Sequence, residues 1–375
     1  MSEQVYIRPI GFAPGPQSEE GDAVRLAGGL VYASRFAVIL RKDGRVVGRW
    51  RASPESIAQV LGQLPESVGA EAEAQWGNLR KSHPPLELGA RTVRLDQPQV
   101  MGILNVTPDS FSDGGKHVGD PAGTRDAIAA MVEAGAGIID IGGESTRPGA
   151  EAVWEEEEIR RVLPAVEAAA SMGAAVSIDT RRAGTMEAAL QAGAVLINDV
   201  SALRYDPRSA ELVARTGCPV VLMHAPGSGT DLHAKSDLGG GGYESVVFDV
   251  FDALRERRDA AVAAGIARDK ILIDPGLGFG KSLGDNLALI NALPLFHALG
   301  CPILLGASRK RMIGALSKEA AANARLGGSI ALALKAMDAG AHILRVHDVP
   351  ETVQARDVWR GLRDAALTDF GDLPG

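Results

Sequence analysis

The chain has 375 residues, of which 46% are hydrophobic and 23% are charged, so it can bury a sizeable core and is not intrinsically disordered. Its formal net charge is −8 and its Lys and Arg residues are spread along the chain, which excludes binding to nucleic acid through a dominant basic face. An anionic ligand would have to be held by local cations, because the overall charge does not attract it.

Residues 1–84 have a pattern of their own. Leu30–Leu40 and Arg45–Arg51 are rich in β-forming residues and flank the turn sequence Lys42-Asp43-Gly44, which predicts a β-hairpin. Ser53-Pro54-Glu55 is typical of a helix start. We expect a small α+β extension here, and its sequence contains no motif that points to chemistry.

Residues 85–375 form the second predicted unit. Pro84-Pro85 marks the change of pattern, and Leu86–Leu95 is expected to form an entry hairpin. From about Gln99 onward, eight short apolar runs recur. They lack polar alternation and are rich in Ile, Val and Leu, as is typical of strands covered on both faces. The runs are Val100–Leu104, Gly137–Ile141, Ala175–Ile178, Ala194–Ile197, Val220–Met223, Ile271–Ile273, Ile303–Leu305 and Ile343–Val346.

Ala-rich amphipathic stretches such as Thr124–Ala134, Glu155–Ala170 and Ala321–Ala339 separate these runs. Eight strand–helix pairs in roughly 275 residues match a closed (β/α)8 TIM barrel. An open doubly wound sheet would carry a Gly-rich dinucleotide turn after its first strand, and none follows Val100–Leu104. We therefore predict an α/β fold, a TIM barrel with a small N-terminal α+β extension. Several helices should end at a glycine, namely Gly135, Gly173, Gly193 and Gly340.

The cysteines and the first residues bear on location. Cys218 and Cys301 are the two cysteines, too few for a disulfide framework or a zinc site, so we expect buried free thiols. Residues 1–6 lack the basic and apolar regions of a signal peptide, and no apolar stretch reaches membrane-spanning length. We expect a cytoplasmic protein that contacts no membrane.

Polar residues follow every apolar run. In a β/α barrel the carboxyl ends of the strands converge on one face, where active sites lie. A single polar residue there is usually a turn former or a helix cap, and we interpret Thr180, Asp199 and Asp348 in that way. Eight such ends together predict a shared site. The ends are Asn105–Gly115, Asp140–Gly149, Asp179-Thr180, Asn198-Asp199, His224, Asp274–Gly276, Ser308–Lys310 and Arg345–Asp348.

The strand-end groups are of two kinds. Carboxylates and amides suit a flat heterocycle with an N–H edge, because carboxylates accept paired donors and amides both donate and accept. Those groups are Asp179, Asn198 and Asp274. Cationic N–H donors suit an anion such as diphosphate. Those donors are Arg147, Arg309, Lys310, Arg345 and His347.

Three further residues have more than one interpretation. Asn105 is either a turn-stabilising side chain or, beside an anion site, a ligand of Mg²⁺, which takes few protein oxygens and completes its shell with phosphate and water. For His224 we favour a histidine of the barrel interior. Lys281 is either a phosphate contact or a solvated loop charge, and the glycines before it do not form a P-loop. We do not assign Lys281 to the site.

Taken together, these segments resemble dihydropteroate synthase. The resemblance covers about Leu86 to the C-terminus, and its most specific blocks are Gly102–Gly115 with Gly142–Gly149, and Ser308–Lys310. It implies an eight-stranded barrel that joins a dihydropterin methyl diphosphate to 4-aminobenzoate and releases diphosphate. It also implies Mg²⁺ as cofactor and suggests a homodimer. The matching segments are Asn105–Gly115, Asp140–Gly149, Ser177–Thr180, Ile197–Ser201, Leu272–Ser282, Ala307–Gly314 and Arg345–Val349.

The resemblance also implies a role for each matching residue. The pterin pocket would comprise Asp179, Asn198, Met223, Asp274, Phe279 and Lys310. The diphosphate and loop-closing groups would be Thr146, Arg147, Arg345 and His347. Asn105 would be the Mg²⁺ ligand, and Phe111 and Pro148 would lie on loops that close over 4-aminobenzoate. We expect catalysis to depend on Asp179, Lys310, Arg345 and His347. Arg311 stands where some members carry Ser to meet the aminobenzoate carboxylate, so that contact is left unassigned.

Two alternatives remain open from the residues. A pterin-dependent methyltransferase serving a corrinoid protein would need neither Mg²⁺ nor diphosphate, and Ser308–Lys310 with the pair Arg345 and His347 argue against it. A non-catalytic pterin-binding subunit should have lost cationic or metal-side residues, all of which are present. For the enzyme, we hypothesise a dissociative substitution in which diphosphate leaves before the weakly nucleophilic amine attacks.

Overall fold

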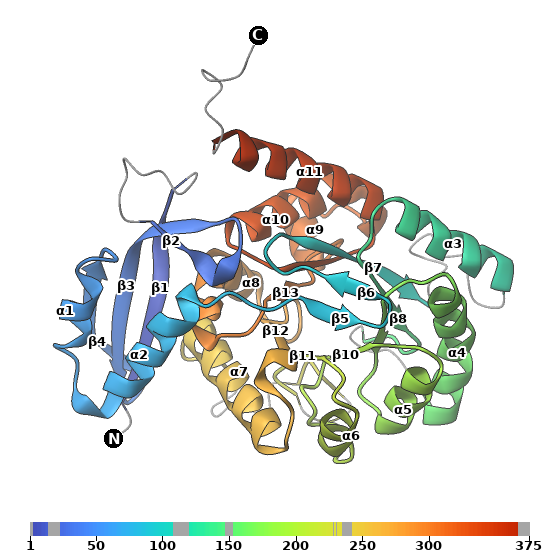
Figure 1. The fold of residues 1–375 in the computed structure, drawn as a ribbon, viewed down its shortest axis with the longest axis horizontal. Coiled ribbons are helices and arrows are strands. Elements are labelled where there is room, and N and C mark those ends of the chain that lie inside the picture. Colours follow the sequence, from blue (N-terminus) through green and yellow to red (C-terminus); the bar gives the residue numbers. More distant parts are fainter. Residues whose placement is uncertain are drawn as a thin grey trace, which may run out of the picture.

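The computed structural model describes residues 3–13, 23–107, 120–146, 153–227, 229, 231–234 and 242–366. A barrel of strands surrounded by helices makes up most of the molecule, and a small sheet with its own helices lies beside it (Figure 1). None of the helices in the described residues has the length and apolar character needed to span a membrane.

The barrel within the described residues is built from eight parallel strands. Their order is β12-β11-β10-β9-β8-β7-β14-β13, and a parallel bridge between Ile273 and Ile303 brings the two ends of this order together. The predicted TIM barrel is confirmed, and each of the eight predicted runs overlaps one strand. The strands are β7 (Gln99–Asn105), β8 (Ile138–Gly142), β9 (Val176–Asp179), β10 (Leu196–Asp199), β11 (Val220–Met223), β12 (Ile271–Asp274), β13 (Leu304–Leu305) and β14 (Ile343–Val346).

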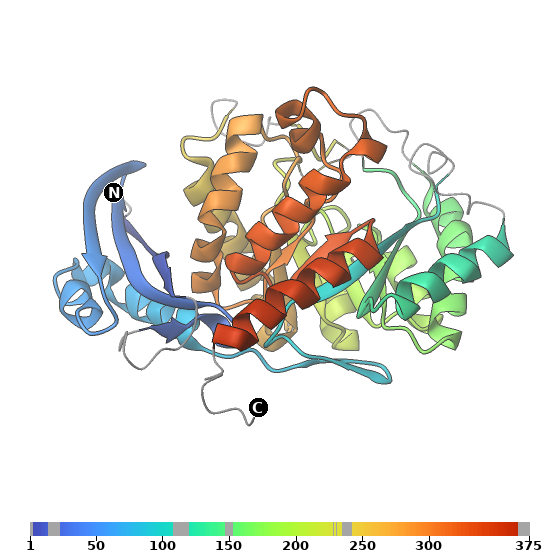
Figure 2. The same cartoon turned by 90° about the horizontal axis from the view of Figure 1, so that it is seen from above.

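Helices connect the strands and cover the outside of the barrel (Figures 1 and 2). The four predicted terminal glycines all have positive φ, between +71° and +111°, which an L side chain rarely adopts. These helix ends were therefore predicted correctly. The helices are α3 (Pro121–Glu133), α4 (Glu155–Ser171), α5 (Ala183–Gln191), α6 (Ser209–Thr216), α7 (Val246–Ala263), α8 (Leu283–Ala292), α9 (Arg311–Leu316), α10 (Leu326–Asp338) and α11 (Val349–Ala366).

Alternation along the strands decides which residues face the barrel interior. Leu196, Leu272 and Ile343 belong to one apolar cluster with the hairpin β5 (Leu86–Leu88) and β6 (Arg91–Val93), which closes that end of the barrel. Their chain neighbours Ile197, Ile271 and Leu344 belong instead to the cluster that packs under the helices. Because side chains alternate with period two, the residue two positions further along each strand faces inward near the opposite end. Those residues are Asn198, Asp274 and Arg345.

The N-terminal extension is a four-stranded sheet with two helices. Strand β3 lies at its centre and pairs antiparallel with β1 on one side and with β2 and β4 on the other. The predicted hairpin is confirmed, whereas β1 was not identified from the sequence. The elements are β1 (Glu3–Ala13), β2 (Val24–Arg25), η1 (Leu26–Gly28), β3 (Tyr32–Lys42), β4 (Arg45–Ala52), α1 (Ile57–Leu61) and α2 (Glu66–Arg80).

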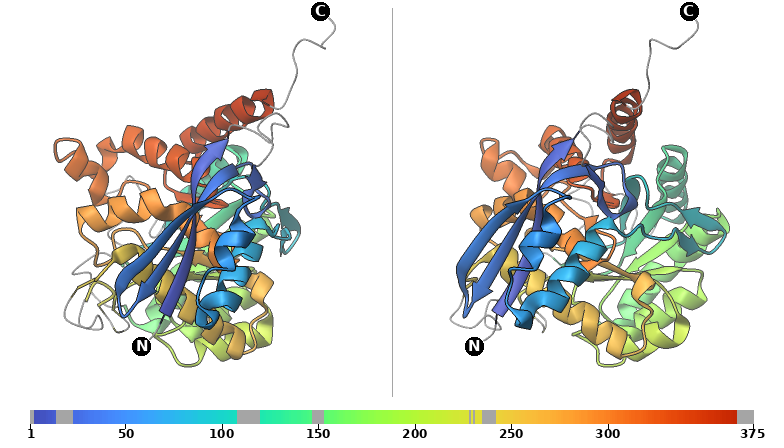
Figure 3. Two further views of the ribbon diagram at one scale, coloured as in Figure 1. Left: turned by 90° about the vertical axis from the view of Figure 1, so that its left-hand side faces the viewer. Right: turned by 60° about the vertical axis from the view of Figure 1, so that its left-hand side comes forward.

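The extension docks on the flank of the barrel (Figure 3). The edge of β1 that faces away from β3 meets α2, where Gln75 accepts from the backbone N–H of Ile7 at 2.9 Å and donates to the carbonyl of Val5 at 2.8 Å. One face of β1 meets α7, where the Tyr6 hydroxyl donates to Asp252 at 2.7 Å. Residues of the sheet and of the barrel belong to one continuous apolar cluster, so the extension shares the core of the barrel.

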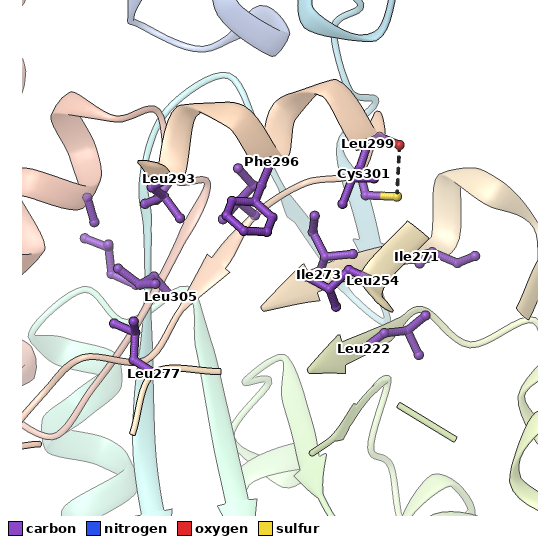
Figure 4. Close-up of a cluster of buried hydrophobic side chains, with 14 of the residues drawn as sticks. Leu222, Leu254, Ile271, Ile273, Leu277, Leu293, Phe296, Leu299, Cys301 and Leu305 are labelled. Atoms are coloured by element: carbon purple, nitrogen blue, oxygen red, sulfur yellow. Dashed lines mark hydrogen bonds between the residues drawn. The ribbon is translucent and has the colours of Figure 1, made fainter. Parts of the chain in front are cut away.

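Part of that shared core lies beneath the 3₁₀ segment η5 (Leu293–Leu299) (Figure 4). Phe296 is fully buried there, and the Cys301 thiol contacts the carbonyl of Leu299 at 3.9 Å. Both cysteines are free and buried, as predicted. Burial raises the pKa of the Cys218 thiol to about 12 and that of Cys301 to about 11, so neither forms a thiolate near neutral pH.

Candidate active site

Arg345 lies at the centre of the polar end of the barrel. It projects inward from β14, and its guanidinium donates from Nε to Asp140 and from Nη2 to Asp179, each at 2.6 Å. Asp140 also accepts from the side-chain amide of Asn198 at 3.1 Å. Four inward residues from four strands are therefore joined in one charge-assisted network, which fixes the Arg345 side chain in place.

Burial dominates the electrostatics of this network. It raises the pKa of Asp179 to about 7, and the neighbouring carboxylate of Asp140 acts in the same direction, while the Arg345 guanidinium opposes the rise. The pKa of Arg345 is above its ordinary range because the nearby carboxylates Asp140 and Asp179 outweigh its own desolvation. Asp179 can thus change its charge near neutral pH, whereas Arg345 stays cationic.

Asp274 provides a second carboxylate on the opposite side of the barrel end. Its Oδ1 accepts from the backbone N–H of Gly276 at 2.7 Å, and burial raises its pKa. Gly276 has φ +69°, and a Cβ there would lie 1.9 Å from the carbonyl oxygen of His224. Only glycine permits this close turn, which aims Asp274 at the barrel end.

Lys310 faces Asp274 from the loop after β13. Its Nζ donates to the carbonyl of Leu277 and lies 4.8 Å from the ring centroid of Phe279. Burial lowers the pKa of Lys310 to about 8, although Asp274 opposes the fall. Phe279 packs in turn against an apolar patch made of Val200, Met223, Ala225 and Leu232. The pterin-pocket residues predicted from the sequence therefore lie at one end of the barrel.

His347 and Arg309 differ in their surroundings. The Nδ1 of His347 lies 3.1 Å from the Ser308 hydroxyl, which also accepts from the His347 backbone N–H at 3.2 Å. Arg309 is in the left-handed region at φ +56°, and its guanidinium pairs through Nε and Nη2 with the carboxylate of Asp348. The turn role predicted for Asp348 omitted this ion pair, which holds Arg309 beside α11.

Asn105 and Thr146 lie at the ends of β7 and β8. The side-chain oxygens of Asn105 and Asp179 lie 3.6 and 3.7 Å from the position that a Cβ on Gly142 would occupy, so both face the same small space. The carbonyl of Thr146 lies 3.1 Å from Nε2 of His233. Three predicted residues lie outside the described residues, namely Phe111, Arg147 and Pro148.

Lys281 anchors a loop. Its Nζ lies 3.0 Å from Nδ1 of His224 and donates to the carbonyls of Gly276 and Phe279 at 2.8 and 3.2 Å. These contacts direct its ammonium group to the loop backbone and to His224. His224 is buried, and burial lowers its pKa well below the ordinary value.

The interpretation of two strand-end residues as turn formers is confirmed. Asp199 accepts from the backbone N–H groups of Ser201 and Leu203 at 2.7 and 2.9 Å. The hydroxyl of Thr180 accepts from the backbone N–H of Arg182 at 3.2 Å.

Two side chains of the site and its surroundings, Asp140 and Glu144, were not predicted from the sequence. Asp140 was noted only as part of a strand end, although its position two residues after Ile138 places it inward in the same way as Asn198. Glu144 was also overlooked. It is nearly buried and pairs with Arg181 at 3.2 Å and with Arg182 at 2.8 Å, bracing the connections after β8 and β9. Only the packed structure shows that pairing.

The fold and the barrel-end residues define a pterin-binding enzyme, since the family described as "Pterin binding enzyme" matches residues 101–347. Dihydropteroate synthase from Escherichia coli K12 is 46% identical over 265 residues, which cover 70% of this chain and 91% of that protein. A probable bifunctional folylpolyglutamate synthase/dihydropteroate synthase from Haloferax volcanii is 48% identical over 269 residues, but the match spans only 31% of its length.

A solved structure agrees with these relatives. Dihydropteroate synthase from Xanthomonas albilineans, determined with 4-aminobenzoic acid, superposes with a TM-score of 0.67 and 45% identity, covering 78% of this chain and 100% of that chain. The chain belongs to the dihydropteroate synthase family. The family match begins at residue 101, after the N-terminal extension.

Proposed function

We propose that this chain condenses (7,8-dihydropterin-6-yl)methyl diphosphate with 4-aminobenzoate, giving 7,8-dihydropteroate and diphosphate. The observation that carries the proposal is the meeting of Asp179, Asp274, Lys310 and Arg345 at one end of a barrel of this family. The reaction is an alkyl transfer. The C–O bond to diphosphate breaks, a C–N bond to the arylamine forms, and the amine loses one proton.

The carboxylates and the amide support recognition of the pterin ring. Asp179 and Asp274 would accept the ring N–H groups, and Asn198, held by Asp140, would complete the polar edge. Met223 and Phe279 offer apolar contact from the patch beside them. Because these acceptors are buried, an analogue without matching N–H donors would leave them unpaired and bind poorly.

The cations support departure of diphosphate. Arg345 is held by two carboxylates through Nε and Nη2, which leaves Nη1 outside these bonds, and His347 is oriented by Ser308. Donors that are already in position stabilise growing negative charge without reorganisation. Arg147 and Thr146 would act with them. The bidentate ion pair to Asp348 favours a role for Arg309 in holding the Ser308–Lys310 loop against α11.

The residues at the barrel end fit a magnesium ion that is held mostly by substrate. Asn105 offers one uncharged oxygen beside Asp179. Among the described residues, no group of three or more His, Cys, Asp or Glu is arranged to hold a metal. Mg²⁺ often takes one or two protein oxygens and completes its shell with phosphate and water, so this arrangement suits it. Asn105 would hold the ion, and the bound ion would neutralise charge on the diphosphate.

The chemistry favours a dissociative order. An arylamine is a weak nucleophile. Stabilising the departing diphosphate would therefore raise the rate more than activating the amine. Anionic Asp179 and Asp274 would stabilise positive charge on the pterin while Arg345 and His347 bind the departing group. The loops that carry Phe111 and Pro148 would then exclude water from the cation until 4-aminobenzoate attacks. A rate that depends strictly on the nucleophilicity of the amine would contradict this order.

The alternatives differ in what they require. A methyltransferase serving a corrinoid protein has no use for a diphosphate-binding group, and a non-catalytic subunit has no need for catalytic residues. The relatives are dihydropteroate synthases, one of them solved with 4-aminobenzoic acid, and they favour the synthase. We further propose a cytoplasmic homodimer, which light scattering and cell fractionation would test.

The deciding experiment measures diphosphate release from the pterin diphosphate with Mg²⁺, with and without 4-aminobenzoate. We expect release that requires Mg²⁺ and dihydropteroate formation that requires both substrates. Arg345→Ala should lose nearly all activity, whereas Arg35→Ala, exposed on β3, should match the wild-type protein. Equal losses in the two variants would mean that the anion site is elsewhere.

A further inference from the structure

His233 lies between the connections that follow three different strands. It belongs to the segment between β11 and α7, and its half-buried ring contacts Thr146 after β8 and Gly280 after β12. The same ring also lies against Phe279, so one side chain contacts residues predicted for two parts of the substrate.

The two hydrogen bonds define the tautomer of His233. The backbone N–H of Gly280 donates to Nδ1 at 3.2 Å, so Nδ1 acts as the acceptor. In a neutral imidazole the proton must then be on Nε2, which lies 3.1 Å from the Thr146 carbonyl and donates to it. The imidazole therefore connects a backbone donor from one loop with a backbone acceptor from another.

The stacking contact connects His233 to Phe279, one of the residues predicted for the pterin pocket. The rings of His233 and Phe279 are nearly parallel, at 12°, with centroids 5.3 Å apart. Phe279 is also the ring beside Lys310, with the ammonium 4.8 Å from its centroid. The rotamer of Phe279 is thus held by His233 as well as by Met223 and Leu232 of the apolar patch.

The backbone around His233 is packed closely. Gly280 has φ +56°, and a Cβ there would lie 2.4 Å from Cγ of Pro226 and 2.9 Å from the carbonyl oxygen of His233. Glycine at this position allows the two segments to approach until the Gly280 N–H reaches the imidazole. The contact is therefore part of how these loops fit together.

We propose that His233 is a positioning residue that couples the segment carrying Thr146 to the pterin-side ring of Phe279. Its stacking face supports the pterin contact, and its Nε2–H holds the carbonyl of Thr146, four residues after the end of β8 and directly before Arg147 in the sequence. The inference rests on the proposed function, because Thr146 and Phe279 have their roles from it. The stack on Phe279 and the hydrogen bond to Thr146 can be removed one at a time. We expect loss of the stack to weaken pterin binding and loss of the hydrogen bond to lower kcat/KM for 4-aminobenzoate.

Three variants of His233 separate these effects. His233→Phe keeps an aromatic ring against Phe279 and removes both hydrogen bonds. His233→Gln keeps an amide N–H for the Thr146 carbonyl and removes the stack. His233→Ala removes both contacts, and Arg35→Gln on the exposed face of β3 serves as a matched surface control. Each variant is measured for kcat, for both KM values, for melting temperature and for the affinity of 6-hydroxymethylpterin by calorimetry.

For His233→Phe we expect pterin affinity within about twofold of wild type and a fall of about tenfold in kcat/KM for 4-aminobenzoate, as the loss of one or two hydrogen bonds predicts. For His233→Gln we expect the reverse, weaker pterin binding with kcat/KM for 4-aminobenzoate mostly restored. His233→Ala should show both defects. The melting temperatures should stay close to that of the wild-type protein.

Two results would overturn the inference. Parallel losses in the Phe and Gln variants would mean that the contacts are not separable, and wild-type kinetics in His233→Phe would mean that the Thr146 bond has no role. A wild-type protein that releases no diphosphate would contradict the proposed function instead. In that event the calorimetry still decides whether the His233 stack supports pterin binding.

Discussion

At the residue scale, two buried aspartates show how strand alternation assigns different work to one residue type. Asp140 on β8 and Asp199 on β10 are both fully buried. Asp140 faces the barrel interior and accepts from Arg345 and Asn198, whereas Asp199 faces a turn and accepts from its backbone. The side of the strand decides which carboxylate meets Arg345 at the candidate site and which stabilises a turn.

A matched pair of variants follows from this contrast. Asp140→Asn should lower kcat/KM by about 10- to 100-fold, because a hydrogen bond to a charged group contributes about 1.5–3 kcal/mol and Arg345 loses its ionised partner. Asp199→Asn should lower the melting temperature and leave the kinetics of the folded protein near wild type. Steady-state assays and calorimetric unfolding check the two. If both variants lost activity equally without loss of stability, the assignment of Asp140 to Arg345 would be wrong.

We expect the pH dependence of the rate to follow the charges of Asp179 and Lys310. Burial raises the pKa of Asp179 to about 7, so its carboxylate form is lost as pH falls below that value. Burial lowers the pKa of Lys310 to about 8, so its ammonium form is lost above that value. If both charges are needed, kcat/KM for the pterin diphosphate should be bell-shaped with limbs near pH 7 and 8.

Measured profiles of variants would assign these limbs. Asp179→Asn should abolish the acidic limb, and Lys310→Arg should move the alkaline limb to higher pH because guanidinium stays protonated. A wild-type rate that is flat between pH 6 and 9 would contradict this assignment.

At the element scale, the N-terminal sheet is held to α7 by polar contacts set into an apolar interface. Asp252 on α7 accepts from Tyr6 at 2.7 Å and from Gln4 at 2.8 Å, and both donors lie on β1. Arg41 on β3 is almost fully buried and lies 3.7 Å from Asp249 of the same helix. The contacts fix how β1 and β3 sit against the helix, while the apolar cluster supplies most of the stability.

Tyr6→Phe tests this docking. The variant leaves the partly buried Asp252 with one donor fewer, and we expect a loss of about 1–3 kcal/mol in the free energy of unfolding with kcat unchanged. Urea unfolding measures the loss. In a double-mutant cycle with Asp252→Asn the two effects should be strongly non-additive, and simple additivity would mean that the hydroxyl acts elsewhere.

At the scale of the whole molecule, three histidines lie where the extension meets the barrel, and two of them, His297 and His342, are buried. The ring of His342 lies 5.0 Å from that of His83 and 5.4 Å from that of His297. Its Nδ1 accepts from the backbone N–H of Ile303 at 2.9 Å, in the segment that closes the barrel. Burial lowers the pKa of His83 to about 3 and of His297 to about 4, and the nearby Lys81 and Arg268 also lower that of His83.

This cluster predicts sensitivity to acid. The unfolded chain takes up protons on these rings below about pH 6.5, whereas the folded protein does not until pH 4 or lower, so stability falls as pH drops. Between about pH 6.5 and pH 4, each ring should lower the free energy of unfolding by about 1.4 kcal/mol for each unit that the pH falls. Urea unfolding at pH 7 and pH 5 measures the loss, and His297→Gln should reduce it by about one ring's share. If His297→Gln lost as much free energy of unfolding between pH 7 and pH 5 as the wild-type protein, the prediction would be contradicted.

The sequence by itself determined the barrel and the composition of its polar end. Eight apolar runs of strand length separated by amphipathic stretches, with no Gly-rich dinucleotide turn after the first run, favour a closed barrel over an open sheet. Parallel strands then bring their carboxyl ends to the same face. Asp179, Asn198, Asp274 and Arg345 could be predicted for that reason, because their position in a strand is a local property. The glycines that end the helices were equally local.

Only the tertiary structure decided which groups meet. Arg345 binds Asp140 and Asp179, which lie 205 and 166 residues away from it in the chain. Arg309 is held by an ion pair with Asp348 and does not face the site alone. The docking of β1 on α7 was likewise invisible in the sequence. Such pairings depend on strand register and on packing between distant segments, which no local pattern encodes.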